Sequence, residues 1–236
     1  MLRAETAWSA LLLRGRGPYE IDGMVFEAPD GASPRFHRRL QSGKYELSER
    51  GLVTRHVPKG ARVLELGGCI GVVACKLNRH LDDPGQHVVL ELDPDVATVL
   101  AANGRRNNAG FHVVAGAVSR RRNARVKRLP SVVSTRIVHG KEGEAVAAHT
   151  IDGLEKRFGV AFDTLVMDIE GGEVNFVRDF GDALKRFDTV MVEVHWWIGP
   201  DNLAEVEGAF SAAGLTRVDS AGAVQIWKRQ SAPAAG

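Results

Sequence analysis

The sequence has little of what stabilises disulfide-rich domains or binds metal through sulfur. Only two of its 236 residues are cysteines, Cys69 and Cys75. Six positions apart on a predicted helix, they point to different faces, which disfavours a bridge between them. No Cys-x-x-Cys pair indicates a zinc or dithiol site. Reduced cysteines fit a reducing compartment, so we expect a cytoplasmic protein.

Long apolar runs and an excess of charge are also missing. No stretch approaches the roughly 18–20 apolar residues of a membrane-spanning helix. The first residues have neither a basic leader nor a small-residue cleavage site, so we expect no signal peptide. Lys and Arg number 31 and Asp and Glu 29, a net charge of +2, so the overall charge predicts no particular partner.

Apolar segments and helical patterns alternate along most of the chain. Strands are predicted at 62–66, 87–91, 111–118, 163–167 and 189–193, and helices at 70–81, 94–107, 173–185 and 202–213. Consecutive apolar residues in the strands are typical of a parallel sheet covered on both faces. Residues 215–228 predict a closing antiparallel hairpin. The fold class is therefore α/β, a doubly wound, mostly parallel Rossmann-like sheet.

The predicted domain has simple boundaries. We expect residues 1–44 to form a lead-in with a short strand near 24–28, and residues 45–228 to form the main domain. Residues 119–150 break the alternation and predict an inserted hairpin or loop at the sheet edge or pocket mouth. Residues 229–236 predict a flexible tail.

A glycine cluster, Glu65-Leu-Gly-Gly-Cys-Ile-Gly71, follows the first strand of this pattern. Glycine lets a ligand approach the backbone closely, because no Cβ intervenes. The G-x-G-x-x-G register of dinucleotide sites fails, since it needs glycine at Leu66. An acidic residue, Glu65, suits a cationic ligand such as S-adenosylmethionine, which carries an amino group and a sulfonium but no phosphate. A plain tight turn is the alternative.

Glu91 ends the second strand and is followed by Leu-Asp-Pro94. A carboxylate at this position can accept hydrogen bonds from both hydroxyls of a ribose. Asp93 is better placed to cap the following helix, which leaves Glu91 for the ligand.

From about residue 45 to residue 195 the sequence resembles the FkbM family of S-adenosylmethionine-dependent methyltransferases. The matching segments, in order, are Gly43-Lys-Tyr-Glu46, Glu65-Leu-Gly-Gly-Cys-Ile-Gly71, Glu91-Leu-Asp-Pro94, Ala117-Val-Ser119, His149-Thr-Ile-Asp-Gly-Leu154, Met167-Asp-Ile-Glu-Gly-Gly-Glu173 and Glu193-Val-His195. The resemblance implies a class I methyltransferase fold with S-adenosylmethionine as cofactor. The implied cofactor residues are Glu65, Gly67, Gly71 and Glu91, with Leu92 and Ala117 flanking the adenine and Tyr45 and Glu46 closing over it.

The acceptor is expected where Asp168 and Glu170 follow one strand and Glu193 and His195 end the next. Ligands of open α/β sheets bind at the carboxyl ends of the strands. His195 is the natural general base, because an imidazole is largely neutral near pH 7, and Asp168 would orient it or share that role. Helix capping by Asp168 and Glu173 is the structural alternative. Carboxylates here would also suit magnesium, and we commit to no metal.

Two neighbouring features have open interpretations. Trp196 and Trp197 predict either the wall of an acceptor pocket or packing beneath the terminal hairpin. Residues 120–128 hold six basic residues in nine, which favours a solvated face over contact with an anionic acceptor, a carrier protein or nucleic acid.

The combined prediction is O-methylation of a hydroxyl on a small molecule, sugar or lipid. A nucleic-acid methyltransferase is the second hypothesis, although no aromatic platform accompanies the basic segment. A non-catalytic S-adenosylmethionine-binding protein is the third, and an NAD-dependent oxidoreductase ranks last. Oligomeric state leaves no signature in the sequence.

Overall fold

A computed structural model describes residues 17–120, 124–128, 135–138 and 143–230. The tail predicted at 229–236 lies outside the described residues from position 231 on. No helix of the described part is long and apolar enough to cross a membrane.

A seven-stranded sheet forms the centre of the molecule, in the order β13-β14-β12-β11-β3-β4-β5. Its parallel strands are β3 (Val63–Leu66), β4 (His87–Glu91), β5 (His112–Ala115), β11 (Thr164–Met167) and β12 (Thr189–Glu193). β14 (Val224–Arg229) runs antiparallel between β12 and β13 (Leu215–Ala221), as the predicted hairpin requires. The strand order reverses at β3 and β11, and the carboxyl ends of such strands border the ligand crevice of doubly wound sheets.

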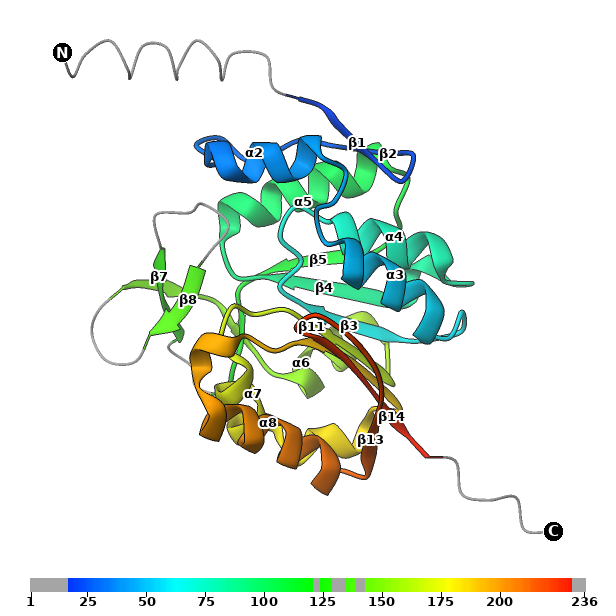
Figure 1. Cartoon of the computed structure of the whole chain (residues 1–236), viewed down its shortest axis with the longest axis vertical. Coiled ribbons are helices and arrows are strands. Elements are labelled where there is room, and N and C mark those ends of the chain that lie inside the picture. The colour runs from blue at the N-terminus through cyan, green and yellow to red at the C-terminus, as the bar shows by residue number, and fades with distance from the viewer. Residues whose placement is uncertain (1–16, 121–123, 129–134, 139–142, 231–236) are drawn as a thin grey trace.

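Helices cover both faces of the sheet (Figure 1). α3 (Leu47–His56), α4 (Val72–His80) and α5 (Pro94–Arg106) lie on one face, and α6 (Ile151–Phe158), α7 (Glu173–Phe180) and α8 (Pro200–Ala212) lie on the other. Side chains alternate between the faces: Leu64 and Leu66 join the α6–α8 core, whereas Val63 packs with α3 and α4. Burial on both faces explains the continuous apolar runs. Short 3-10 turns η1 (Pro84–Gln86), η2 (Ala183–Arg186) and η3 (Trp196–Ile198) complete the connections.

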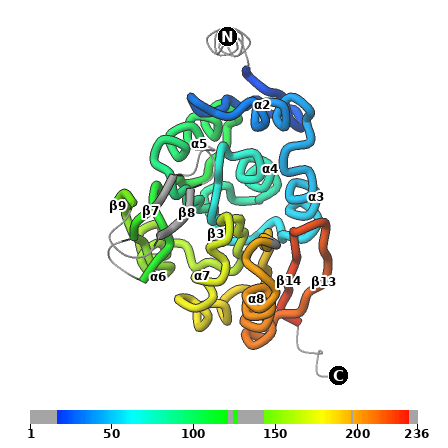
Figure 2. The backbone as a smooth tube through the Cα atoms, turned by 60° about the vertical axis from the view of Figure 1, so that its left-hand side comes forward, coloured from blue at the N-terminus to red at the C-terminus, as the bar shows by residue number. Residues whose placement is uncertain are grey.

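The segment before α3 packs against α4 and α5, as Figure 2 also shows. It contains β1 (Tyr19–Ile21), β2 (Met24–Phe26) and α2 (Pro34–Gln41), of which only a strand near β2 was predicted. Asn103 of α5 accepts from the backbone N–H of Glu27 and donates to the carbonyls of Glu27 and Ile70. These bonds tie the N-terminal segment to the glycine loop.

The predicted strand 111–118 is wrong in one respect, because it is divided in two. β5 ends at Ala115, and Gly116 turns the chain with a φ of +138°. A Cβ on Gly116 would lie 2.5 Å from the carbonyl oxygen of Ala147, so the turn requires glycine. β6 (Ala117–Val118) then pairs in parallel with β10 (Ala148–His149), outside the main sheet.

The inserted region contains a small antiparallel sheet. Its strands are β7 (Ala124–Arg128), β8 (Thr135–Val138) and β9 (Glu144–Val146), in the order β8-β7-β9. The sheet projects from one side of the domain (Figure 1). Part of the basic segment, residues 121–123, lies outside the described residues.

Candidate functional site: a glycine loop and an acidic pocket

Gly67 allows two loops to touch at the switch point of the sheet. It follows β3 with a φ of +89°, and a Cβ placed on it would lie 1.7 Å from the carbonyl oxygen of Asp168. The chain after β3 therefore lies against the chain after β11, which no larger residue would permit. The predicted cofactor loop and the predicted acceptor site are joined through this one position.

The amides of the glycine loop point at the end of β4. Gly67 and Gly68 both donate to the carbonyl oxygen of Leu90, at 2.9 and 3.1 Å, and the N–H of Cys69 donates to Glu91 Oε2 at 2.9 Å. Pyrophosphate sites offer such N–H groups to the ligand. Because these three are already bonded within the protein, the loop fits a cofactor without phosphate.

Glu91 is nearly buried where β4 ends. Its Oε1 accepts from the N–H of Asp93 at 2.9 Å while Oε2 accepts from Cys69. Burial raises the pKa of Glu91 to about 7 despite these hydrogen bonds. Each carboxylate oxygen retains acceptor capacity, as a ribose diol requires. Asp93 caps α5 by accepting from the N–H of Asp95, with Pro94 in the first turn.

Glu65 lies deeper than the resemblance suggests. Its side chain is buried on the α3–α5 face, and its Oε2 lies 2.9 Å from Nε2 of the buried His87. One side of the carboxylate is thus bonded to the imidazole of the next strand. Contact between Glu65 and a cofactor stays a prediction.

Tyr45 and Glu46 lie beside the glycine loop. The hydroxyl of the buried Tyr45 is 3.3 Å from Cys69 Sγ, and Phe36 packs edge-on against its ring. Burial, assisted by the charge of Glu49, raises the pKa of Glu46 to about 8. Leu92 is partly exposed after β4, whereas Ala117 is buried in β6.

Three non-glycine residues with left-handed backbone occur around these loops. Glu46, Cys69 and Glu170 have φ values of +50°, +45° and +53°. Such conformations are unfavourable for L-residues and concentrate at functional sites.

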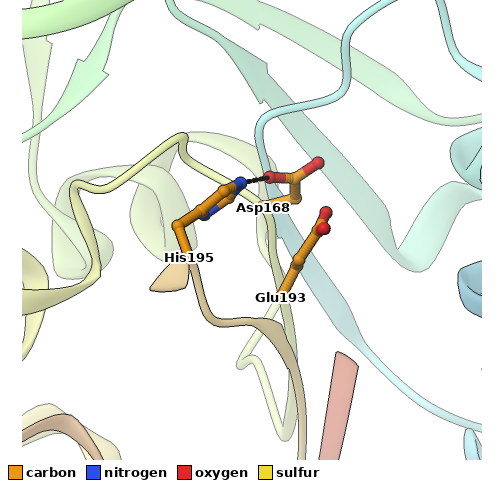
Figure 3. A group of neighbouring side chains, drawn as sticks. All are labelled: Asp168, Glu193 and His195. Atoms are coloured by element: carbon orange, nitrogen blue, oxygen red, sulfur yellow. Dashed lines mark ion pairs between the residues drawn. The ribbon is translucent and has the colours of Figure 1, made fainter. Parts of the chain in front are cut away.

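The predicted catalytic residues converge at the carboxyl ends of β11 and β12 (Figure 3). His195 is 5% exposed, and its Nε2 lies 3.6 Å from Asp168 Oδ1 and 3.8 Å from Glu170 Oε2. One ligand atom each from Asp168, Glu193 and His195 lie within 4.8 Å of one another. The sequence therefore identified the members of this cluster.

Glu173 binds the Nδ1 side of the His195 imidazole, the side opposite Asp168. It is fully buried, and its Oε1 lies 2.9 Å from His195 Nδ1 and accepts from the N–H of Gly171 at 3.2 Å. Hydrogen bonding to a carboxylate fixes the tautomer and the ring plane of a histidine. Because Nδ1 is engaged by Glu173, Nε2 is the nitrogen that faces Asp168 and Glu170. The sequence showed Glu173 only as a possible capping residue.

Asp168 does not cap a helix. α7 begins after Gly172 and has no side-chain cap, whereas Asp168 Oδ1 is buried without a hydrogen bond. Its backbone N–H instead donates to the carbonyl of Leu66, which places the side chain at the strand ends.

Burial, followed by the charges of neighbouring carboxylates, shifts the pKa values of the acidic residues in this cluster. Burial raises the pKa of Asp168 well above its usual value, and the charges of Glu193 and Glu170 raise it further. Burial likewise raises the pKa of Glu193. Burial alone would lower the pKa of His195, but the hydrogen bond and the charge of Glu173 raise it above the ordinary value.

A hollow of about 290 Å³ opens beside the cluster. Trp197, 41% exposed, lies over His195 with 4.3 Å between ring centroids and forms one wall of this hollow, while its role at an acceptor site stays a prediction. The other lining residues combine apolar, amide and charged groups: Glu170, Gly171, Val174, Asn175, Arg178, Ile198 and Asn202.

This fold and site define the class of Rossmann-like methyltransferases that use S-adenosylmethionine. The model of the methyltransferase FkbM domain matches residues 62–214, and the chain belongs to that family. Tyr45 and Glu46 precede the matched region. A search of curated proteins finds no match.

Solved methyltransferases are among the structures to which the chain is similar. An O-methyltransferase from Bacillus cereus in complex with SAH is 17% identical over 95% of this chain and 90% of its own, with a TM-score of 0.44. Precorrin-6y C5,15-methyltransferase from Geobacter metallireducens is 11% identical over 87% and 93%, with a TM-score of 0.49. Fibrillarin from Aeropyrum pernix with bound S-adenosyl-L-methionine is 13% identical over 76% and 72%, with a TM-score of 0.45. The family assignment rests on the domain match instead, because these likenesses are low.

Proposed function

We propose that this methyltransferase methylates a hydroxyl oxygen of a small molecule, a sugar or a lipid. The observation that carries the proposal is the imidazole of His195, held at Nδ1 by Glu173 and facing Asp168 with Nε2. A hydroxyl is a poor nucleophile until it loses its proton, and a positioned imidazole contributes about 10²–10⁴-fold to such a transfer.

The cofactor site is assigned to the glycine loop and the end of β4. Gly67 lets the loop lie against Asp168, Gly71 lets it pack on Leu100, and Glu91 would accept hydrogen bonds from the ribose hydroxyls. Leu92 and Ala117 would flank the adenine, with Tyr45 and Glu46 closing the site. When bound, S-adenosylmethionine supplies the methyl group and a good leaving group at sulfur.

The protein's own contribution is placement and proton transfer. The hollow beside Trp197 has about the volume of a small ligand site and combines apolar, amide and charged lining groups. Trp197 and Glu170 line it and contact His195, so we place the acceptor there with its hydroxyl near the imidazole. Asp168, on the opposite side, orients the hydroxyl or the imidazolium that forms. Alignment of the reacting atoms supplies much of the remaining rate.

The test uses S-adenosylmethionine with an isotopically labelled methyl group. Sugars, hydroxylated lipids and phenols are offered in parallel with amine analogues of matched shape, and NMR locates the methyl group in the product. We expect methyl on oxygen, and a kcat about 10²–10⁴-fold lower in His195→Gln. Asp201→Asn, which changes an exposed carboxylate at the start of α8, is the control. Methylation of nitrogen or of RNA alone would overturn the proposal.

A further inference from the structure

Two atoms of the Asp168–Glu193–His195 cluster face each other without a hydrogen bond. Nε2 of His195 and Oδ1 of Asp168 are 3.6 Å apart, too far for an N–H···O hydrogen bond, and Oδ1 is buried with no hydrogen bond at all. Since Nδ1 of His195 bonds Glu173, only Nε2 is directed at Oδ1 across this gap. Burying unpaired polar atoms in this way is unfavourable.

The 3.6 Å between His195 Nε2 and Asp168 Oδ1 suits a shared cation. Two ligands at roughly 2.0–2.2 Å from one ion are separated by about 3–4 Å, depending on the angle between them. The ligand atoms of Asp168, Glu193 and His195 all lie within 4.8 Å of one another. Figure 3 shows the three side chains directed toward a common point from the ends of β11 and β12.

The surroundings of His195 have the organisation of a metal ligand. A metal-binding imidazole usually donates its other N–H to a carboxylate, which fixes the tautomer that coordinates. Glu173 Oε1 occupies that position at 2.9 Å, and both side chains are at least nine-tenths buried. An ordinary acidic surface patch would not include a buried histidine whose ring is held by a hydrogen bond to a buried glutamate.

We propose that Asp168, Glu193 and His195 bind a divalent transition-metal ion. One imidazole and two carboxylates form a mixed nitrogen and oxygen set, which favours Mn²⁺, Fe²⁺ or Zn²⁺ over Mg²⁺ and Ca²⁺. Three protein ligands would leave coordination positions open, where an acceptor hydroxyl could bind.

The inference deepens the proposed function and rests on it, with one change of mechanism. An ion held by these residues would make a bound hydroxyl more acidic, so that its proton would pass to water. The oxygen would then bond the methyl carbon as the carbon–sulfur bond of S-adenosylmethionine breaks and S-adenosylhomocysteine leaves. His195 is then a ligand and not the proton acceptor, so the two mechanisms predict opposite results on removal of metal.

Binding is measured first, without any acceptor. Tag-free protein, stripped with chelator, is titrated with MnCl₂ by electron paramagnetic resonance and with ZnCl₂ and MgCl₂ by calorimetry. We expect one Mn²⁺ or Zn²⁺ per chain, and weaker binding of Mg²⁺. Glu193→Gln and His195→Gln should each lower the affinity at least tenfold. Glu173→Gln, which touches no ion, should lower it about 10–100-fold by releasing the imidazole.

Two control variants show whether binding is specific. His112→Gln removes an exposed imidazole on β5, and Asp201→Asn removes an exposed carboxylate. Both should bind one ion with unchanged affinity. Circular dichroism identifies any variant that fails to fold. If one does, the stoichiometry of metal binding to the wild type still tests whether the site exists. Absence of stoichiometric binding, or binding that His195→Gln and Glu193→Gln leave intact, would overturn the metal site.

Activity separates this inference from the proposed function. Methylation of a hydroxyl acceptor that stops with chelator and returns with Mn²⁺ or Zn²⁺ supports both. Undiminished O-methylation by metal-free protein overturns the ion and leaves the general-base mechanism standing.

Discussion

Replacement of Gly67 by alanine tests the contact between the two loops of the site. At a φ of +89° an alanine is strained by about 1–2 kcal/mol. Its Cβ would also lie 1.7 Å from the carbonyl oxygen of Asp168, so the loops must separate. Overpacking of this kind costs about 1–3 kcal/mol more. We expect Gly67→Ala to lower the free energy of unfolding by roughly 2–5 kcal/mol.

Gly159→Ala is the matched control for this experiment. Gly159 ends α6 with a φ of +69°, and no atom lies within 4 Å of a Cβ built there. This variant should therefore show the backbone strain alone, about 1–2 kcal/mol. It should bind S-adenosylmethionine as the wild type does, whereas Gly67→Ala should bind it at least tenfold more weakly.

Urea unfolding and calorimetric titration with S-adenosylmethionine measure the two effects. Equal destabilisation by both variants, together with normal cofactor binding by Gly67→Ala, would refute the argument that close approach at Gly67 builds the site.

Three further outcomes are expected. The folded-state pKa of Glu91, about 7 against the ordinary 4.5, means that the folded protein keeps a proton that the unfolded chain has released. The stability that the Glu91 carboxyl contributes should therefore fall by about 3 kcal/mol as pH rises from 4.5 to 7. Urea unfolding of the wild type across this pH range should show this decrease in the free energy of unfolding, and Glu91→Gln should not show it. His87→Leu leaves Glu65 buried without its partner and should cost about 3–5 kcal/mol in thermal or urea unfolding, whereas a loss below 1 kcal/mol would show that the pair is unimportant. Trp197→Ala removes one wall of the hollow and should raise the KM for the acceptor about tenfold. The affinity for S-adenosylmethionine should stay unchanged. An unchanged KM for the acceptor would place the acceptor site elsewhere.

Local patterns predicted most of the sheet and the members of the site. Continuous apolar runs gave the positions of β3, β4, β11 and β12 within a residue, because strands buried on both faces have no polar side to interrupt them. The prediction that Asp168 and His195 lie together followed from the strand positions, because the carboxyl ends of neighbouring parallel strands meet at one edge of the sheet. The cap at Asp93 was equally readable, because capping depends on adjacent residues.

The partners of these residues depend on tertiary structure. The bonds from His87 to Glu65 and from Glu173 to His195 each join residues 22 positions apart. A buried histidine or glutamate looks in sequence like any polar residue in a strand or a first helical turn. Strand β4 is predictable as a strand, but its register beside β3, which brings His87 to Glu65, is set by the packing of the whole sheet.

The sequence by itself determined most strands and helices of the central sheet, the glycine loop, the family and the acidic and histidine residues at the ends of β11 and β12. These follow from local propensity, burial pattern and short motifs. Only the tertiary structure decided that Gly67 touches Asp168, that the loop amides are already bonded to β4, and that Nε2 of His195 faces an unpaired carboxylate oxygen. Such facts are distances between segments far apart in the chain, and they exist only once the sheet has brought those segments together.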